Sequence, residues 1–202
     1  MKIKSHQLRV RYLFYRVLQW FYFRYNPDKP WMCKEVNQFL INHIKPHMSI
    51  LEYGCGSSTK FYATYAKAVV SIETNKNWYD LINTRLSDLN NVQLKLVKDD
   101  KFNYVQNFEA NSFDIVVNDA SHRELVSISA LDVLKSGGIL IIDNAERYIK
   151  SPYLSLPAEG QVYNNHDDPR VSIWKEFTMN TKDWKSKWYT DNVNSTLVLI
   201  KP

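Results

Sequence analysis

The sequence is poor in glycine and cysteine and contains no long apolar run. Only five of its 202 residues are glycine, and only Cys33 and Cys55 are cysteine. Neither cysteine belongs to a CxxC pair, which argues against a zinc site or a disulfide framework and predicts two reduced thiols in an intracellular protein. No apolar stretch reaches the roughly 20 residues of a membrane-spanning helix. The hydrophobic content of 45% is that of a globular domain with one core.

The positive charge is concentrated at the N-terminus. The net charge is +5, yet residues 1–31 alone hold seven Lys and Arg residues against one Asp. The near-neutral remainder makes nucleic acid an unexpected partner. Residues 12–25 are rich in aromatic side chains and interrupted by Arg16 and Arg24, and no cleavage site of a signal peptide follows them. Residues 1–34 are therefore expected to form a basic, aromatic helical arm.

Two interpretations of this arm stay open. The arm can pack on the domain as a lid or as the surface of a homodimer. Alternatively, residues 1–31 can lie in a membrane interface, with aromatic rings at the headgroups and Arg facing anionic lipid. The expected location is cytoplasmic, either free or peripheral at a membrane.

Residues 35–202 alternate between short apolar strands and amphipathic helices. The pattern predicts strands at 49–53, 69–73, 92–97, 113–119, 138–143, 187–190 and 195–200, and helices at 35–44, 58–66, 78–86, 124–134 and 172–179. This order is typical of an α/β fold with a parallel sheet covered on both faces. We expect one domain over 35–202, with a Rossmann-like doubly wound sheet of about seven strands, mostly parallel with a C-terminal antiparallel strand.

A glycine-containing loop follows the first predicted strand. Gly54 and Gly56 permit a tight turn and close approach of a ligand, and Glu73 at the end of the next strand can accept the hydroxyls of a ribose. The third glycine of a dinucleotide fingerprint is replaced by Thr59. Glu52 before the loop would repel a pyrophosphate but attract the sulfonium and ammonium of S-adenosylmethionine. These charges favour the methyl donor over NAD.

The loop and its neighbours resemble the class I S-adenosylmethionine-dependent methyltransferases. Residues 50–56 resemble motif I of that family, and residues 70–73 resemble its ribose-binding strand end. Residues 98–100 are similar to the segment that brackets adenine, and residues 134–140 resemble the turn into strand five, with Ser136 in place of the usual proline. The resemblance implies a methyltransferase whose cofactor contacts are Glu52, Tyr53, Gly54, Cys55, Gly56, Ser58, Thr59, Glu73, Asp99, Asp100 and Asp119.

Acidic and amide side chains also end the fourth and fifth predicted strands. Asp119, Asp143 and Asn144 provide oxygen ligands of the kind that Mg²⁺ prefers, and they resemble the metal site of catechol and caffeoyl-CoA O-methyltransferases. A cation there would hold a substrate hydroxyl, so Asp119 and His122 are the expected catalytic residues, with His122 taking the proton. The alternative is structural: Asp119 caps a helix, Asp143 anchors a loop and His122 is solvated.

The acceptor is expected to be a hydroxyl. Residues 118–122 lack the Asn/Asp-Pro-Pro-aromatic motif of methyltransferases that act on amino groups of nucleic acids. The leading hypothesis is O-methylation of a small molecule or glycan. Two alternatives remain, an NAD-dependent oxidoreductase on a Rossmann fold and a non-catalytic nucleotide-binding module. Residues 145–171 show no clear periodicity and form either a functional lid or a solvated loop.

Overall fold

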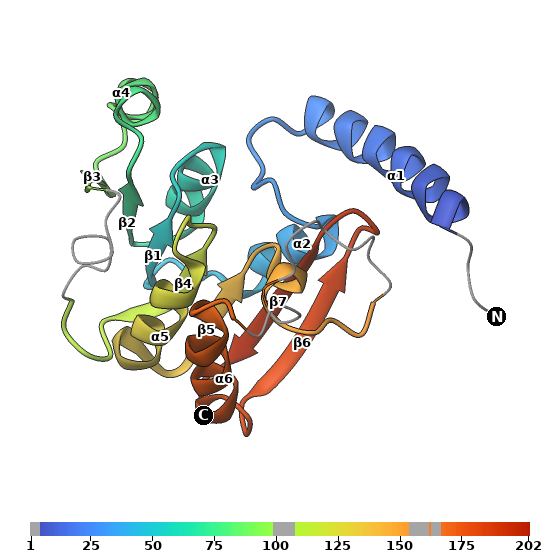
Figure 1. The fold of residues 1–202 in the computed structure, drawn as a ribbon. Coiled ribbons are helices and arrows are strands. Elements are labelled where there is room, and N and C mark those ends of the chain that lie inside the picture. Colours follow the sequence, from blue (N-terminus) through green and yellow to red (C-terminus); the bar gives the residue numbers. More distant parts are fainter. Residues whose placement is uncertain (1–4, 99–107, 154–161, 163–166) are drawn as a thin grey trace.

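The computed structural model describes residues 5–98, 108–153, 162 and 167–202, with side chains from Val10 onward. The predicted adenine contacts Asp99 and Asp100 lie outside the described residues. The chain begins with helix α1, Ser5–Tyr25, which extends away from a compact α/β body in Figure 1. The sequence Asn26-Pro27 follows α1, and proline cannot continue a helix. In the described part of the chain, no helix is long and apolar enough to cross a membrane.

The body is built on one seven-stranded sheet with the strand order β3-β2-β1-β4-β5-β7-β6. The strands are β1 Ser49–Tyr53, β2 Ala68–Glu73, β3 Val92–Leu96, β4 Phe113–Asn118, β5 Leu134–Ile142, β6 Lys185–Thr190 and β7 Ser195–Ile200. Strands β1 to β5 pair in parallel, and β7 is antiparallel to both β5 and β6. This topology confirms the predicted mostly parallel sheet with a C-terminal antiparallel strand.

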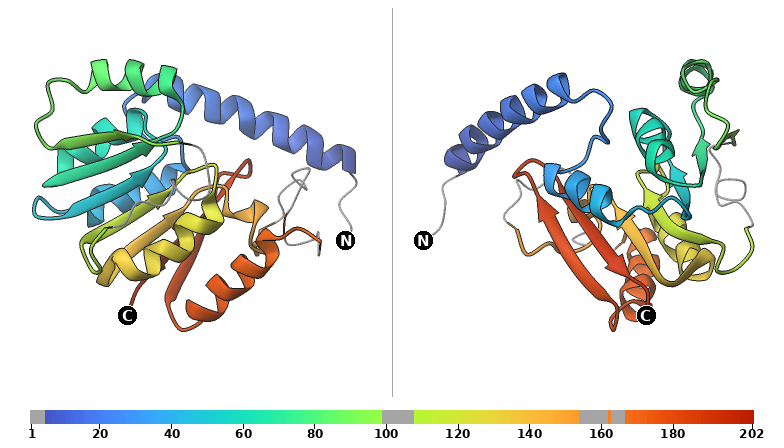
Figure 2. Two further views of the ribbon diagram at one scale, coloured as in Figure 1. Left: turned by 60° about the vertical axis from the view of Figure 1, so that its left-hand side comes forward. Right: turned by 180° about the vertical axis from the view of Figure 1, so that it is seen from behind.

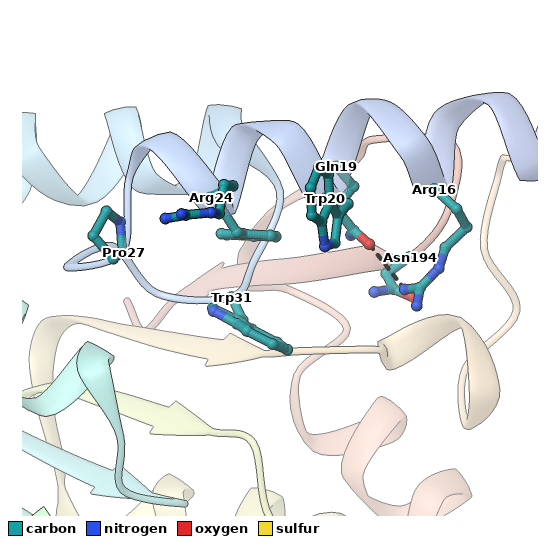
Figure 3. A pocket seen from close by; sticks show the side chains of 8 residues that line it. Arg16, Gln19, Trp20, Arg24, Pro27, Trp31 and Asn194 are labelled. Carbon is teal, nitrogen blue, oxygen red and sulfur yellow. Dashed lines mark hydrogen bonds between the residues drawn. The ribbon is translucent and has the colours of Figure 1, made fainter.

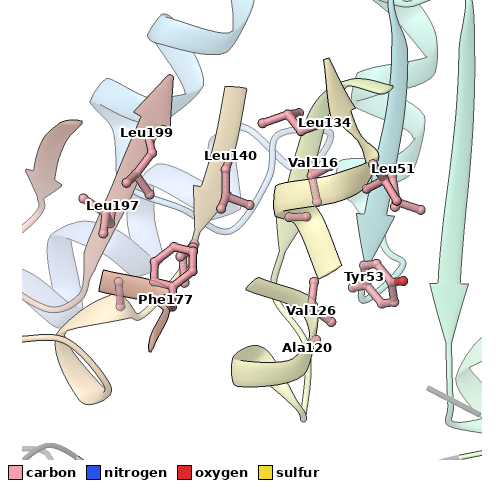
Figure 4. Packing of buried hydrophobic residues seen from close by; sticks show 14 of the residues in the cluster. Leu51, Tyr53, Val116, Ala120, Val126, Leu134, Leu140, Phe177, Leu197 and Leu199 are labelled. Carbon is pink, nitrogen blue, oxygen red and sulfur yellow. The ribbon is translucent and has the colours of Figure 1, made fainter. Parts of the chain in front are cut away.

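Helices cover both faces of the sheet (Figure 2). The helices of the body are α2 Lys34–His43, α3 Ser57–Tyr65, α4 Lys76–Arg85, α5 Arg123–Val133 and α6 Arg170–Asn180, with a short 3-10 helix η1 at Ala145–Arg147. Because side chains alternate along a strand, Ile115 and Val117 of β4 pack with α2 and α3. Val116 packs on the opposite face with α5 and α6, in the core shown in Figure 4.

Strand β5 begins four residues earlier than predicted. Leu134 pairs with Phe113 of β4, and the next paired residue is Ile139, opposite Ile115. The residues between Leu134 and Ile139 form an irregularity in the strand. Gly137 in this segment has a φ of 75°, a positive value that glycine adopts without strain. The Gly137 N–H still donates to Lys201 O at 2.9 Å, so hydrogen bonding to the C-terminal residues continues through the predicted turn.

Candidate functional site

A cavity opens where the order of the strands reverses. Strands β1 and β4 lie side by side, and their chain connections run to opposite sides of the sheet. Ligands of doubly wound sheets bind in the crevice at this point, outside the carboxyl ends of the strands. The cavity measures about 420 Å³. Its walls come from the arm, β1 and the loop after it, the start of α3, α4, and the end of β4. They comprise Phe23, Pro27, Pro30, Trp31, Met32, Glu52, Gly54, Cys55, Gly56, Ser57, Ser58, Trp78, Arg85, Val117 and Asp119.

Glu52 is a buried carboxylate on the wall of this cavity, and its partners are neutral. It accepts hydrogen bonds from the hydroxyls of Ser58, of Thr59 at 2.6 Å and of Ser71 at 2.6 Å. Burial raises the pKa of Glu52 to about 7, against the opposing effect of the three hydroxyl donors. No cation balances the negative charge within these contacts, so the ionised carboxylate favours a positively charged ligand.

The packing of the protein explains why glycine stands at position 54 of the loop, but not why it stands at position 56. Gly54 has a φ of 98°, and a Cβ there would lie 2.6 Å from the carbonyl oxygen of Asp119. The close approach of the residue after β4 therefore requires glycine at this position. A Cβ on Gly56 would lie 3.9 Å from its nearest neighbour, Ser58 Oγ. The packing of the protein does not require glycine at 56, so the space beside Gly56 is available to a ligand in the cavity.

Glu73 stands next to the cavity rather than on its wall. Its Oε1 accepts the backbone N–H groups of Thr74 and Asn75, each at 2.8 Å, and its Oε2 accepts the Cys55 thiol at 3.3 Å. Burial raises the pKa of the Cys55 thiol well above its usual range. The Trp78 indole N–H donates to the carbonyl oxygen of Cys55 at 2.7 Å, which fixes the ring on the cavity wall.

The acids at the ends of β4 and β5 are linked by a guanidinium group. Arg123 at the start of α5 forms an ion pair with the exposed Asp119 and donates to the carbonyl oxygens of Ala120 and, at 2.9 Å, Asp143. The Asp143 carboxylate is buried, accepts the Thr196 hydroxyl at 2.7 Å and has a raised pKa because of that burial. The guanidinium thus lies between the two strand ends, where it contacts the Asp119 carboxylate and the carbonyl oxygen of Asp143.

The described contacts give no support to the predicted magnesium site. Among the described residues, no group of three or more His, Cys, Asp and Glu side chains is placed to hold a metal ion. Asp119 is paired with Arg123, and Asp143 directs one oxygen to Thr196. Asn144 adopts a left-handed backbone with φ 52° at the start of η1. The prediction of a metal held by Asp119, Asp143 and Asn144 therefore stays a prediction, and the ion pair of Asp119 with Arg123 counts against it.

Two further predicted site residues lie away from the cavity. His122 precedes α5 and lines a different, open groove with Glu124, Asp168 and Arg170. Its Nδ1 lies 3.8 Å from Glu124 Oε1. Tyr53 is 1% exposed and packs in the hydrophobic core, as Figure 4 shows. The structure therefore brings Glu52, Gly54, Cys55, Gly56, Ser58 and Asp119 together on one cavity wall, without His122 and Tyr53.

The sequence interpretation missed aromatic and basic residues of the cavity. Trp78 and Arg85 come from α4, and Phe23 and Trp31 come from the arm. Asn75 caps α4 by accepting the Trp78 N–H at 3.0 Å, and this places Trp78 in the first turn, beside the loop after β1. Asn75, a helix-capping residue three positions before Trp78, is the sequence signal that could have placed Trp78 at the start of α4. The sequence carries no comparable signal for the arm, because its position depends on tertiary contacts.

The sequence matches no protein-family model and no curated protein with significance. Solved structures do match the fold. A candidate caffeoyl-CoA O-methyltransferase from Staphylococcus aureus is 17% identical with a TM-score of 0.60, over 93% of this chain and 92% of that one. An O-methyltransferase from Bacillus cereus in complex with SAH is 19% identical, with a TM-score of 0.55 over 80% and 78%. An rRNA methylase from Streptococcus thermophilus is 20% identical, with a TM-score of 0.52 over 81% and 92%.

At these identities the likeness concerns the fold alone. The matching proteins are named for acceptors as different as caffeoyl-CoA and rRNA, so the fold does not specify an acceptor. The strand order, the reversed β7 and the cavity at the switch point agree with the motifs of the sequence. The chain has the Rossmann-like fold of the class I S-adenosylmethionine-dependent methyltransferases.

Proposed function

We propose that this chain is an S-adenosylmethionine-dependent methyltransferase that methylates a hydroxyl oxygen of a small molecule or glycan. The observation that carries the proposal is the Glu52 carboxylate, held only by neutral hydroxyls on the wall of the cavity at the switch point. A buried carboxylate without a cationic partner attracts the sulfonium and ammonium groups of the donor. The same charge would repel the pyrophosphate of a dinucleotide.

The chain's own residues suit the other parts of the donor. Gly56 leaves room for close approach, and its backbone N–H is held by Thr59 Oγ1 at 3.0 Å. The fixed indole of Trp78 offers an apolar wall for the adenine ring. Glu73 Oε2 lies within reach of Cys55 and can accept a ribose hydroxyl. The bound donor supplies an activated methyl group, and these residues would orient it.

Asp119 is the residue that we assign to the acceptor. Its exposed carboxylate lines the cavity, and its ion pair with Arg123 fixes its orientation. It can accept a hydrogen bond from an acceptor hydroxyl and so aim the oxygen at the methyl group. In the transfer, the new bond from oxygen to methyl forms as the bond from sulfur to methyl breaks. S-adenosylhomocysteine leaves, and the hydroxyl proton passes to the carboxylate or to water.

The alternative of an NAD-dependent oxidoreductase receives less support. The dinucleotide fold has a parallel sheet of order 3-2-1-4-5-6, whereas here an antiparallel β7 lies between β5 and β6. Thr59 is buried and donates to Glu52 at 2.6 Å, at the position where the dinucleotide fingerprint has its third glycine. A non-catalytic module stays possible on the same residues and is separated from an enzyme by the activity measurement below.

The test is calorimetric titration of the full chain with S-adenosylhomocysteine. We expect binding to the wild type and a loss of about ten- to a hundredfold in affinity for Glu52→Gln, because a charge-assisted contact becomes a neutral one. The amide keeps the shape of the side chain, and the three hydroxyls can rotate to match it. Asp114→Asn is the matched control, because Asp114 contacts Ser49 N and Lys135 at the opposite end of the sheet.

Absence of binding to the wild type would refute the donor, as would equal affinities of wild type and Glu52→Gln. NADH should give no heat of binding. Methyl transfer is then measured with labelled S-adenosylmethionine and a panel of hydroxylated acceptors. Donor binding without transfer to any acceptor favours the non-catalytic module, and transfer to an amino group instead would contradict the assignment to hydroxyls.

A further inference from the structure

The outward side of α1 is a continuous apolar surface. Leu13 is 62% exposed, Val17 53% and Phe14 59%. The exposed large apolar residues of the helix are Val10, Leu13, Phe14, Val17, Leu18, Trp20, Phe21 and Tyr25. Their spacing places all of them except Trp20 on the outward side of the helix, whereas Trp20 lines a groove beneath it. We call these seven residues, without Trp20, the outer face of α1.

The opposite side of α1 faces the body through polar contacts. Arg11 donates to Asn192 Oδ1 at 2.7 Å, and Gln19 donates to Asp191 Oδ2 at 2.7 Å. Both partners lie in the turn between β6 and β7, and the helix runs over this turn in Figures 1 and 2. A helix on a folded domain normally turns its apolar stripe inward and its polar side to water. The side of α1 towards the body also carries half-buried aromatic residues, such as Tyr15 and Phe23. The apolar residues of the outer face nevertheless stay exposed, so packing on the body does not explain them.

We propose that the outer face of α1 docks on the interface of an anionic membrane. The charge of the arm selects this partner, because residues 1–31 hold seven Lys and Arg residues against one Asp. Two copies of the chain meeting through this face would bring like charges together, whereas anionic lipid offers opposite charge. Arg24 and Trp20 are exposed and line the groove beneath α1, and their sequence neighbours Tyr25 and Phe21 belong to the outer face. Exposed aromatic and basic residues beside an apolar helix face are the pattern of helices that lie in the interface.

The arm also connects this face to the donor cavity. A groove of about 380 Å³ runs beneath α1 and is lined by Arg16, Gln19, Trp20, Phe23, Arg24, Pro27, Trp31 and Asn194 (Figure 3). Phe23 and Trp31 stack with ring centres 5.5 Å apart, and both also line the donor cavity. Docking of the outer face would therefore set this side of the cavity close to the lipid headgroups. The docking itself does not depend on the proposed enzymatic function.

Vesicle flotation of the full chain tests the proposal. We expect the chain to float with vesicles of phosphatidylcholine and phosphatidylglycerol, and to float less as salt is added, because salt screens the charges. Val17→Glu and Phe21→Glu together should lower the partition coefficient at least about tenfold, because apolar area is lost and like charge is introduced. Met179→Glu is the control, because Met179 is also an exposed apolar residue, at 66%, but belongs to α6, and the variant should float like the wild type.

Three results would overturn the inference. The first is a wild-type chain that stays unbound in the presence of anionic vesicles. The second is a double variant that floats as well as the wild type. The third is a lipid-free dimer in light scattering that Val17→Glu dissociates, because the outer face would then meet a second copy of the chain. Circular dichroism shows whether the double variant keeps its helices. The salt dependence of the wild type provides a readout that needs no variant.

Discussion

The carboxyl end of β1 and the carboxyl ends of β4 and β5 both carry acids, but the protein treats them differently. Glu52 near the end of β1 is surrounded by hydroxyls, whereas Asp119 after β4 is paired with the Arg123 guanidinium, which also binds the carbonyl oxygen of Asp143. A carboxylate with neutral partners keeps an unbalanced charge for a ligand. An acid paired with a cation of the protein has its charge balanced and is held in one orientation, as Asp119 is by Arg123. The partner of a strand-end acid, and not the acid alone, therefore indicates its role.

Removal of the guanidinium should have the largest effect on this comparison. Arg123→Met leaves Asp119 without its cation and the carbonyl oxygens of Ala120 and Asp143 without their donor. We expect the free energy of unfolding to fall by about 2–3 kcal/mol, mainly because two carbonyl oxygens lose their donor, since an ion pair with an exposed carboxylate adds little. Chemical denaturation measures this loss. Combination with Asp119→Asn should restore part of the stability. A loss below about 1 kcal/mol for Arg123→Met would show that the guanidinium does not stabilise the ends of β4 and β5.

A change of pH should affect the β1 end with an intermediate magnitude. The pKa of Glu52 is raised to about 7, and a cationic ligand binds the ionised form. The affinity for S-adenosylhomocysteine should therefore fall as the pH drops below 7, by up to about tenfold per pH unit. Calorimetry at several pH values measures the slope. Glu52→Gln should show a flat profile, and an equal slope in this variant would assign the titration to another group.

Protonation of Glu52 should stabilise the folded chain, whereas protonation of an ordinary paired carboxylate destabilises it. Its pKa in the folded chain lies above the usual 4.5, so the folded state binds a proton more readily than the unfolded state. The contribution of this group to the free energy of unfolding increases as the pH falls from 7 towards 4.5. Glu52→Gln removes that contribution, and denaturation of the free chain at the two ends of this range compares the two proteins.

Metal ions should have the smallest effect. Because Arg123 lies between the ends of β4 and β5 and pairs with Asp119, we expect Mg²⁺ or EDTA to shift the Tm by less than about 1 °C. Thermal unfolding of the full chain measures the shift. A rise of several degrees that depends on Mg²⁺ and disappears in Asp143→Asn would support the metal site and contradict the comparison.

Most of the sheet was predictable because the hydrophobic period is a local property. The strand predicted at 49–53 coincides with β1, and the helix predicted at 35–44 differs from α2 by one residue at each end. The beginning of β5 was not predictable, because Leu134 joins the strand by pairing with Phe113, which is distant in sequence. Tyr53 was expected at the cofactor, but strand alternation places its ring in the core.

The sequence by itself determined the alternation of strands and helices, the loop with Gly54 and Gly56, and the acids that end the strands. Each of these follows from the type of residue and its immediate neighbours. Tertiary structure alone decided that hydroxyls from α3 and β2 surround Glu52 and that Arg123 bridges the ends of β4 and β5. It also decided that α1 turns its apolar face outward. The physical reason is that hydrogen-bond and ion-pair partners are chosen in space, across elements that the local pattern does not relate.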